Sequence, residues 1–287
     1  MKYNAALYPF ESKWIKLNND QIHYIDEGTG QVILFSHAAI GSSFMYRRFV
    51  QILGKHFRCI ALDFPGFGIS QHDSQKQYSI VSQADLLGKF IKGLGLQDII
   101  AFGHDTGGPS IINVAVRYPD IFKGLILTDT IMFPTTEYQK IHKMLRVVGS
   151  TPFEWLNSRT NFLTKLTLNK GVTSRRLLKE EKHEYFKMTF DSNRRNNITS
   201  VLSSLRQNPD FMNAIKNGLE NQLNQKPTLL IYGENDPVNI LGIPERIHKM
   251  MTNSELFLIN SESHFPHEGQ PERMSEIIFE WINNLNT

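Results

Sequence analysis

The feature that most constrains the fold is an alternation between short runs rich in β-branched and aromatic residues and longer segments of helical periodicity. Such an alternation is typical of a mostly parallel sheet with helices on its faces, and it predicts an α/β protein. The first two predicted strands, which Asn18, Asn19 and Asp20 join, are expected to form a hairpin. The predicted strands span residues 13–17, 21–26, 32–36, 58–63, 98–103, 124–129, 228–233 and 255–259.

Helical periodicity is clearest over residues 79–94, 106–118 and 272–285. Between residues 129 and 228 the strand pattern stops and only helix-like periodicity remains, which predicts a helical insertion into the α/β core. The predicted domain organisation is an N-terminal part of the core at 1–133, a helical cap at 134–222 and a C-terminal part of the core at 223–287.

Composition excludes several classes of protein. The net charge of +3 is too small to predict nucleic acid as the main partner. The single cysteine, Cys59, excludes an internal disulfide and a cysteine-rich metal site. The sequence has no signal-peptide pattern and no long apolar run, so we expect a cytoplasmic protein without membrane insertion. It also lacks metal-binding, phosphate-loop and dinucleotide motifs, so we expect no metal and no cofactor, and oligomeric state is not predicted.

The most informative segment for function is an apolar strand that runs into Gly-His-Asp-Thr-Gly at residues 103–107 and then into a helix. Glycines on both sides of Asp105 permit a sharp turn that leaves the central side chain above the sheet at a helix N-terminus. The helix dipole favours an ionised carboxylate there. Asp105 is therefore a candidate nucleophile, and an N-cap of the helix is the structural alternative.

An acid and a histidine follow at the ends of later strands. Asp236 comes after the strand at 228–233, and His264 lies in the loop after the last strand. Open α/β sheets place their sites at the carboxyl ends of strands, so these side chains are expected to meet Asp105. The order nucleophile, acid, histidine is that of a catalytic triad. Asp129, at the end of the strand at 124–129, is a second candidate for the acid.

Together these motifs resemble the α/β-hydrolase fold of the group with an aspartate nucleophile, most closely the haloalkane dehalogenases and more distantly the epoxide hydrolases. The resemblance implies an eight-stranded, mostly parallel sheet flanked by helices, with a helical cap inserted after the sixth strand. It favours Asp236 over Asp129 as the acid, and it implies an oxyanion hole at the backbone N–H groups of Ala39 and Thr106. The matching segments are 35–37, 63–70, 103–108, 233–236 and 264–267.

An aspartate nucleophile predicts a particular chemistry. A carboxylate that attacks an sp³ carbon forms an alkyl ester, and a histidine can then activate the water that hydrolyses it. This chemistry suits alkyl halides and epoxides, and the resemblance to haloalkane dehalogenases implies that Asp105, His264 and Asp236 cleave a carbon–halogen bond in a small apolar substrate, with water as the second reactant.

The sequence departs from the dehalogenase pattern at both halide ligands. Thr106 follows the nucleophile where the family has a tryptophan, and Ala39 replaces an asparagine. Trp155, in the insertion, is a candidate donor of a replacement N–H group and a possible substrate-binding residue. Epoxide hydrolysis, the first alternative, requires tyrosine donors, for which the insertion offers Tyr138 and Tyr185. A ligand-binding protein of this fold without catalysis is the second alternative.

Overall fold

The computed structural model describes residues 1–17, 19–71 and 76–285 of the protein. A single eight-stranded sheet runs through these residues. In sheet order the strands are β1 (Lys13–Leu17), β2 (Asp20–Glu27), β4 (Arg58–Leu62), β3 (Val32–Ser36), β5 (Ile99–His104), β6 (Phe122–Thr128), β7 (Thr228–Gly233) and β8 (Ser254–Ile259). β1 and β2 pair as an antiparallel hairpin, and the strands from β4 to β8 are parallel. The predicted sheet is confirmed, and Asn18 of the hairpin link lies outside the described residues.

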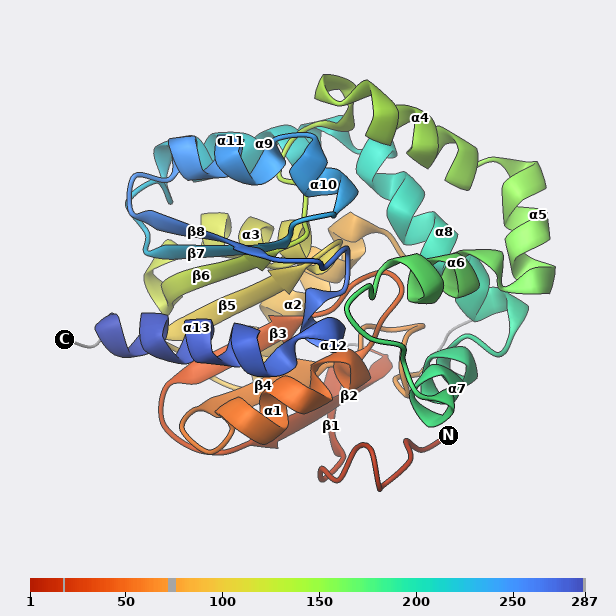
Figure 1. The fold of residues 1–287 in the computed structure, drawn as a ribbon, viewed down its shortest axis with the longest axis horizontal. Coiled ribbons are helices and arrows are strands. Elements are labelled where there is room, and N and C mark those ends of the chain that lie inside the picture. Colours follow the sequence, from red (N-terminus) through yellow and green to blue (C-terminus); the bar gives the residue numbers. More distant parts are fainter. Residues whose placement is uncertain (18, 72–75, 286–287) are drawn as a thin grey trace.

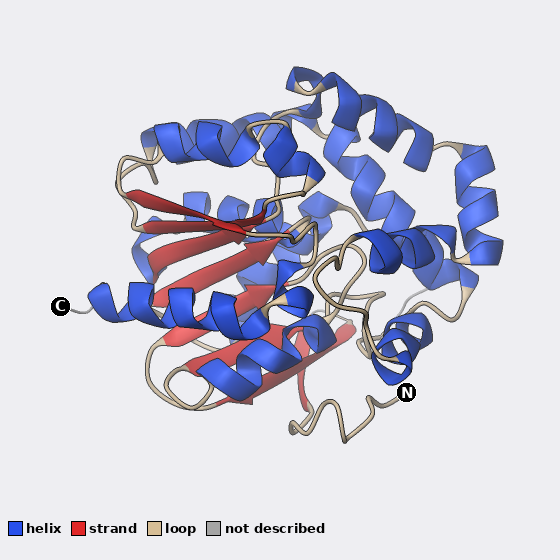
Figure 2. Ribbon diagram, in the orientation of Figure 1, coloured by secondary structure: helices blue, strands red, loops and turns tan. Residues whose placement is uncertain are grey.

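Helices cover both faces of the sheet (Figures 1 and 2). The central strands are buried on both sides, so consecutive residues enter opposite cores: Leu34 packs in one and Phe35 in the other. This burial explains why the strands read as continuous apolar runs in the sequence. One face carries α1 (Arg47–Leu53) and α13 (Pro271–Asn284), and the other carries α2 (Ile80–Gly93), α3 (Gly107–Arg117), α9 (Pro209–Asn221) and α11 (Ile243–Met250).

The predicted helices of the core agree with the observed ones to within about one residue at each end. α2 starts after Ser79, whose hydroxyl accepts a hydrogen bond from the Ser82 N–H at 3.2 Å. The Ser82 hydroxyl in turn accepts one from the Ser79 N–H at 2.9 Å, which completes a capping box. Short elements complete the core: α10 (Pro237–Ile240), α12 (Pro266–Gly269), and the 3-10 helices η1 (Ser43–Tyr46) and η2 (Pro119–Ile121).

The helical insertion follows β6 and lies beyond the carboxyl ends of the strands (Figure 1). α9 falls inside the predicted cap range 134–222, but its apolar face packs against the core helices. The domain boundaries therefore stay a prediction. Across the described residues, neither the insertion nor the core has a helix long and apolar enough to cross a bilayer. The elements of the insertion are η3 (Thr135–Glu137), α4 (Gln139–Val148), α5 (Thr151–Thr160), α6 (Phe162–Lys170), α7 (Lys179–Met188) and α8 (Ser192–Gln207).

Candidate active site

Asp105 lies at a sharp turn between β5 and α3, beside the point where the strand order reverses. The chain continues from β3 to β4 on one side of β3, and β5 pairs with its other side. Strand ends at such a point border a crevice in open α/β sheets. Asp105 has a left-handed backbone, with φ of 49°, and a Cβ on Gly107 would lie 2.0 Å from the Ser36 carbonyl oxygen. This close approach requires glycine and gives the strand–turn–helix that the sequence predicts.

The Asp105 carboxylate faces both backbone donors and an imidazole. Its Oδ2 accepts a hydrogen bond from the Ala39 N–H at 3.2 Å, and the Thr106 N–H interacts with the same carboxylate. Its Oδ1 lies 3.8 Å from His264 Nε2. Burial raises the pKa of Asp105, and the positive charge of His264 and the two N–H groups offset part of that rise. The predicted oxyanion-hole residues therefore do lie at the nucleophile candidate.

His264 is bound on its other side by Asp236. His264 Nδ1 and Asp236 Oδ2 are 2.6 Å apart, and the Asp236 carboxylate is fully buried. The Val238 N–H donates to Asp236 Oδ1 at 2.5 Å and holds the carboxylate at the start of α10. Burial would lower the pKa of His264, but the charges of Asp236 and Asp105 overcome this effect and raise it to about 10. The three predicted side chains thus form one hydrogen-bonded and ionic chain.

Asp129 lies nearby but contacts other groups. It accepts hydrogen bonds from the Thr128 hydroxyl at 2.6 Å and the Gly233 N–H at 2.8 Å, so it links the ends of β6 and β7. His104 Nδ1 lies 3.9 Å from Asp129 Oδ2. Burial and the negative charge of Asp236 raise the pKa of Asp129 well above the usual range. Of these two carboxylates, Asp236 is therefore the one that forms a hydrogen bond with His264.

The predicted leaving-group donors contact groups other than Asp105. Trp155 on α5 is 58% exposed, and its ring lies 4.3 Å from the Arg159 guanidinium. The Tyr185 hydroxyl donates to Glu268 at 2.7 Å, and the Tyr138 hydroxyl accepts from Arg246 at 3.2 Å. Between the described residues, no hydrogen bond links any of these three side chains to Asp105. The two tyrosine hydroxyls are therefore already bound elsewhere.

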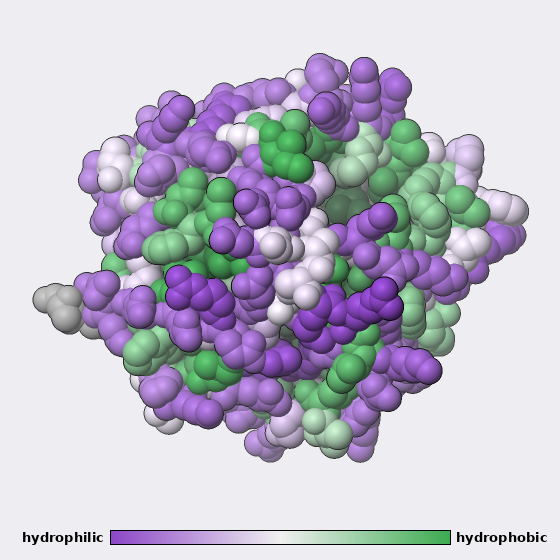
Figure 3. Space-filling view, viewed as in Figure 1, coloured by the Kyte–Doolittle hydropathy of each residue, from purple (hydrophilic) through white to green (hydrophobic). Residues whose placement is uncertain are grey.

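A pocket opens beside Ala39, between the core and the insertion. Hydrophobic side chains gather over the insertion on the face that Figure 3 shows, around a recess. Arg194, on α8, is the lining residue with a full positive charge, and its Nη1 donates to the Gly68 carbonyl at 2.6 Å. Residues 66–68 of this lining belong to the segment 63–70 that matched the resemblance, whereas no sequence pattern indicated Arg194, because only packing of the insertion brings it there. The lining residues are 39–42, 44, 66–68, 185, 188, 189, 194 and 198.

Within the described residues, no group of three or more His, Cys, Asp or Glu side chains could hold a metal ion. His104 and His267 lie near His264, with ring centroids 5.2 Å apart for His104 and His264. Burial lowers the pKa of both His104 and His267 well below the usual value, so these rings are neutral and buried.

The fold and the site define an α/β hydrolase: the chain belongs to the alpha/beta hydrolase fold family, which matches residues 31–271. Haloalkane dehalogenase 2 of Mycobacterium tuberculosis (strain ATCC 25618 / H37Rv) is 31% identical to this chain over 281 residues, 96% of each protein. Epoxide hydrolase 3 of Mus musculus is 22% identical over 294 residues, which cover 94% of this chain and 76% of that protein.

Solved structures show the same fold. The haloalkane dehalogenase DatA from Agrobacterium tumefaciens C58 superposes with a TM-score of 0.86 at 20% identity, covering 98% of this chain and 99% of that one. The resemblance to haloalkane dehalogenases and the more distant one to epoxide hydrolases, which the motifs predicted, are both confirmed.

Proposed function

We propose that this protein is a haloalkane dehalogenase-like hydrolase that acts through an alkyl ester on Asp105. The observation that carries the proposal is the placement of the Asp105 carboxylate between two sets of groups. Backbone N–H groups of Ala39 and Thr106 contact it on one side, and the His264–Asp236 pair lies on the other. Small apolar halides and water are the proposed reactants, and the cytoplasm remains the expected location.

In the first step, Asp105 Oδ1 attacks the carbon that bears the halogen. A carbon–oxygen bond forms, the carbon–halogen bond breaks, and the halide leaves with the bonding electrons. Oδ2 is held by the Ala39 N–H, so it becomes the carbonyl oxygen of the ester. His264 remains protonated during this step, since two carboxylates raise its pKa to about 10.

Esterification prepares the second step. It removes the negative charge of Asp105, one of the charges that raise the pKa of His264, so His264 releases its proton more readily. Neutral His264 then takes a proton from a water molecule, which attacks the ester carbonyl. The N–H groups of Ala39 and Thr106 stabilise the oxyanion that forms on Oδ2. When this intermediate collapses, the departing alkoxide takes the proton from His264 and leaves as the alcohol. The new carboxyl group of Asp105 then passes its proton to His264, which restores the carboxylate and the protonated imidazole.

Cleavage of a carbon–halogen bond is favoured over epoxide opening by the state of the two tyrosines. An opening epoxide places charge on an alkoxide, which needs a proton donor as it forms. The Tyr185 hydroxyl donates a hydrogen bond to Glu268, and the Tyr138 hydroxyl accepts one from Arg246. A halide leaves as a stable anion and needs no proton, so cleavage of a carbon–halogen bond does not require either hydroxyl to leave these contacts.

The test is a trap for the ester. His264→Ala should allow the first step and block the second, so a haloalkane such as 1-bromobutane should add one butyl group to the protein. Intact-mass measurement and peptide mapping should place this group on Asp105, and the double variant Asp105→Ala, His264→Ala should gain no mass. A hydroxyalkyl adduct with epoxides, and none with haloalkanes, would instead support epoxide hydrolysis. No adduct together with no halide release from the wild type would refute the proposal.

A further inference from the structure

The loop that carries His264 is held on one side by the core. The Asn235 N–H donates to the Glu262 carbonyl at 2.7 Å, and the Ser261 N–H donates to a Glu234 carboxylate oxygen at 3.0 Å. Ser261 has a left-handed backbone with φ of 62°, so these contacts hold an unfavourable conformation. Glu234 and Asn235 are the two residues before Asp236, so these hydrogen bonds join the loop of His264 to the loop of Asp236.

The other side of the same loop is held by the insertion. A segment of irregular backbone between α6 and α7, residues 171–175, runs along it. The Gly171 carbonyl accepts a hydrogen bond from the Phe265 N–H at 2.7 Å. The Thr173 hydroxyl donates to the Ser261 carbonyl at 2.5 Å, and its N–H donates to Glu262 at 3.3 Å. The 171–175 segment thus contacts backbone groups on both sides of His264 in the sequence.

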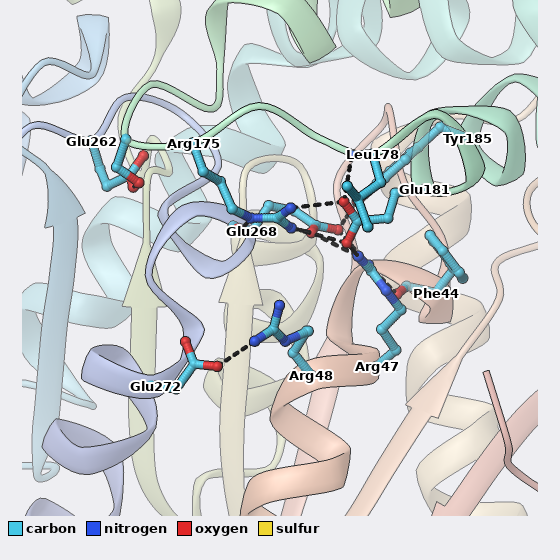
Figure 4. A network of polar contacts seen from close by, with 11 residues as sticks. Phe44, Arg47, Arg48, Arg175, Leu178, Glu181, Tyr185, Glu262, Glu268 and Glu272 are labelled. Carbon is cyan, nitrogen blue, oxygen red and sulfur yellow. Dashed lines mark hydrogen bonds and ion pairs between the residues drawn. The ribbon is translucent and has the colours of Figure 1, made fainter. Parts of the chain in front are cut away.

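Arg175 completes this contact beyond His264. Its Nε donates to the Glu268 carbonyl at 2.6 Å, and its Nη2 lies 3.1 Å from the Glu268 carboxylate. Its Nη1 also pairs with Glu181 at 2.7 Å, so the guanidinium joins α7 to α12. Figure 4 shows Arg175 extended toward Glu268 and Glu181, and Glu262 on the other side of its backbone. Contacts of the 171–175 segment therefore extend from residue 261 to residue 268.

A buried group of charges keeps Arg175 in place. Arg47, 2% exposed at its side chain, forms ion pairs with Glu181 at 2.7 Å and Glu268 at 2.5 Å, so two arginines balance two glutamates. Burial raises the pKa of Glu181, but the hydrogen bonds and charges of Arg175 and Arg47 outweigh it and lower the pKa to about 2. Fully paired buried charges of this kind hold a defined geometry, because any displacement leaves a charge unpaired.

The imidazole packs near the rings of His104 and Phe265, with centroids 5.2 and 5.5 Å away, and neither contact is a directional hydrogen bond. Within the described parts of the chain, the His264 ring forms one hydrogen bond, from Nδ1 to Asp236. Its Nε2 lies 3.8 Å from Asp105 Oδ1, and the hydrolytic step requires a water molecule placed between this nitrogen and the ester carbonyl. The position of Nε2 therefore depends on the backbone of the loop.

We propose that Thr173 and Arg175 are positioning residues for His264, so that the insertion contributes to hydrolysis of the ester as well as covering the substrate. The inference rests on the proposed function. The 171–175 segment contacts the histidine loop through these bonds. Loss of the bonds that Thr173 and Arg175 form should therefore displace His264 Nε2 and slow the second step. The first step, which needs Asp105 and no base, should be unaffected.

The experiment separates the two steps in the full-length protein. Arg175→Lys keeps the charge beside Glu181 and removes the forked donor, and Thr173→Val removes one hydroxyl of the same loop contact. Arg176→Gln is the matched control, because Arg176 is the exposed neighbour of Arg175. Each protein is mixed with 1-bromobutane, quenched at intervals, and assayed for halide released and for ester by intact mass.

We expect both variants to accumulate the Asp105 ester and to hydrolyse it about 10- to 100-fold more slowly than the wild type, the range for a displaced catalytic group. The rate of ester formation should stay within about twofold, and Thr173→Ser should restore hydrolysis. Unchanged hydrolysis in the variants, or an equal loss in both steps, would overturn the inference while wild-type turnover upholds the proposed function. Absence of halide release from the wild type would overturn both.

Discussion

Two buried carboxylates near the imidazole differ in what each one contacts. Asp236 lies 2.6 Å from His264 Nδ1, whereas Asp129 accepts hydrogen bonds from Gly233 and Thr128. An acid that orients a catalytic imidazole must hold its Nδ1–H, because this contact sets which nitrogen faces the substrate. The contacts therefore distinguish two residues that each follow a strand, and they support the proposal that Asp236 is the acid.

The first prediction at this scale concerns Asp236→Asn. An amide cannot balance the charge of the imidazolium, and it can reverse the hydrogen bond to Nδ1. We expect hydrolysis of the Asp105 ester to slow by about 10²- to 10⁴-fold, as for a lost acid–base partner. Halide release in steady state and accumulation of ester by intact mass measure this effect.

Asp129→Asn is the matched comparison. Asp129 is equally buried but bonded to Gly233 and Thr128, so its neutral analogue should change hydrolysis by less than about tenfold. A larger loss in Asp129→Asn than in Asp236→Asn would reverse the assignment of the acid.

At the scale of elements, the junction of β5 and α3 determines where Asp105, the proposed nucleophile, lies. A Cβ at Gly107 would approach the backbone oxygen of Ser36, which cannot move without displacing β3. We expect Gly107→Ala to lower the free energy of unfolding by about 1 to 3 kcal/mol, the usual cost of overpacking. Denaturant unfolding measures this change.

Gly88→Ala provides the control for that prediction. Gly88 lies inside α2, where the atom nearest an added Cβ is 3.6 Å away, so the methyl group meets only ordinary contacts. Alanine is favoured over glycine in a helix, and we expect Gly88→Ala to raise stability by about 0.5 to 1 kcal/mol. Equal effects in the two variants would contradict the steric argument at Gly107.

At the scale of the whole molecule, buried ion pairs join the insertion to the core. Arg47 on α1 contacts Glu181 on α7 and Glu268 on α12. We expect Arg47→Met to cost about 3 to 5 kcal/mol of folding free energy, because it leaves buried carboxylates without part of their compensating charge. Arg273→Met, which breaks an exposed pair with Glu276, should cost less than about 1 kcal/mol. Similar losses of stability in denaturant unfolding would contradict this view of the interface.

Stability should also depend on pH through the site. His264 has a pKa of about 10 in the folded protein and about 6.5 in the unfolded chain. Its proton therefore stabilises the fold fully below about pH 6.5, and this contribution is lost as the pH rises toward 10. We expect the free energy of unfolding of the wild type to fall across this range relative to His264→Gln.

The comparison between these two proteins isolates His264. Both contain His104 and His267, whose lowered pKa values reduce stability as the pH falls below about 6.5, and this effect is common to the two. Parallel stability curves from pH 6.5 to 10 would show that His264 does not carry the raised pKa.

Much of the fold could be predicted from the sequence because its signals are local. Buried parallel strands appear as short apolar runs, and a serine cap or a proline marks the start of a helix. The turn at Asp105 could be predicted for the same reason, since its glycines satisfy a steric demand of their own immediate neighbours. The proposed oxyanion donors, the backbone N–H groups of Ala39 and Thr106, were implied by the resemblance to the dehalogenases, and both interact with the Asp105 carboxylate.

The sequence by itself therefore determined the α/β class, the strands, and the three side chains that meet at the carboxyl edge of the sheet. For the acid, the sequence favoured Asp236 and left Asp129 open, and the tertiary structure shows that Asp236 contacts His264. Tertiary structure alone decided which groups the hydroxyls of Tyr138 and Tyr185 contact, and that residues 171–175 contact the histidine loop. These outcomes depend on side-chain directions and on contacts between segments distant in the chain, such as Arg47 with Glu268. No local pattern encodes such contacts, because packing of the insertion on the core selects them.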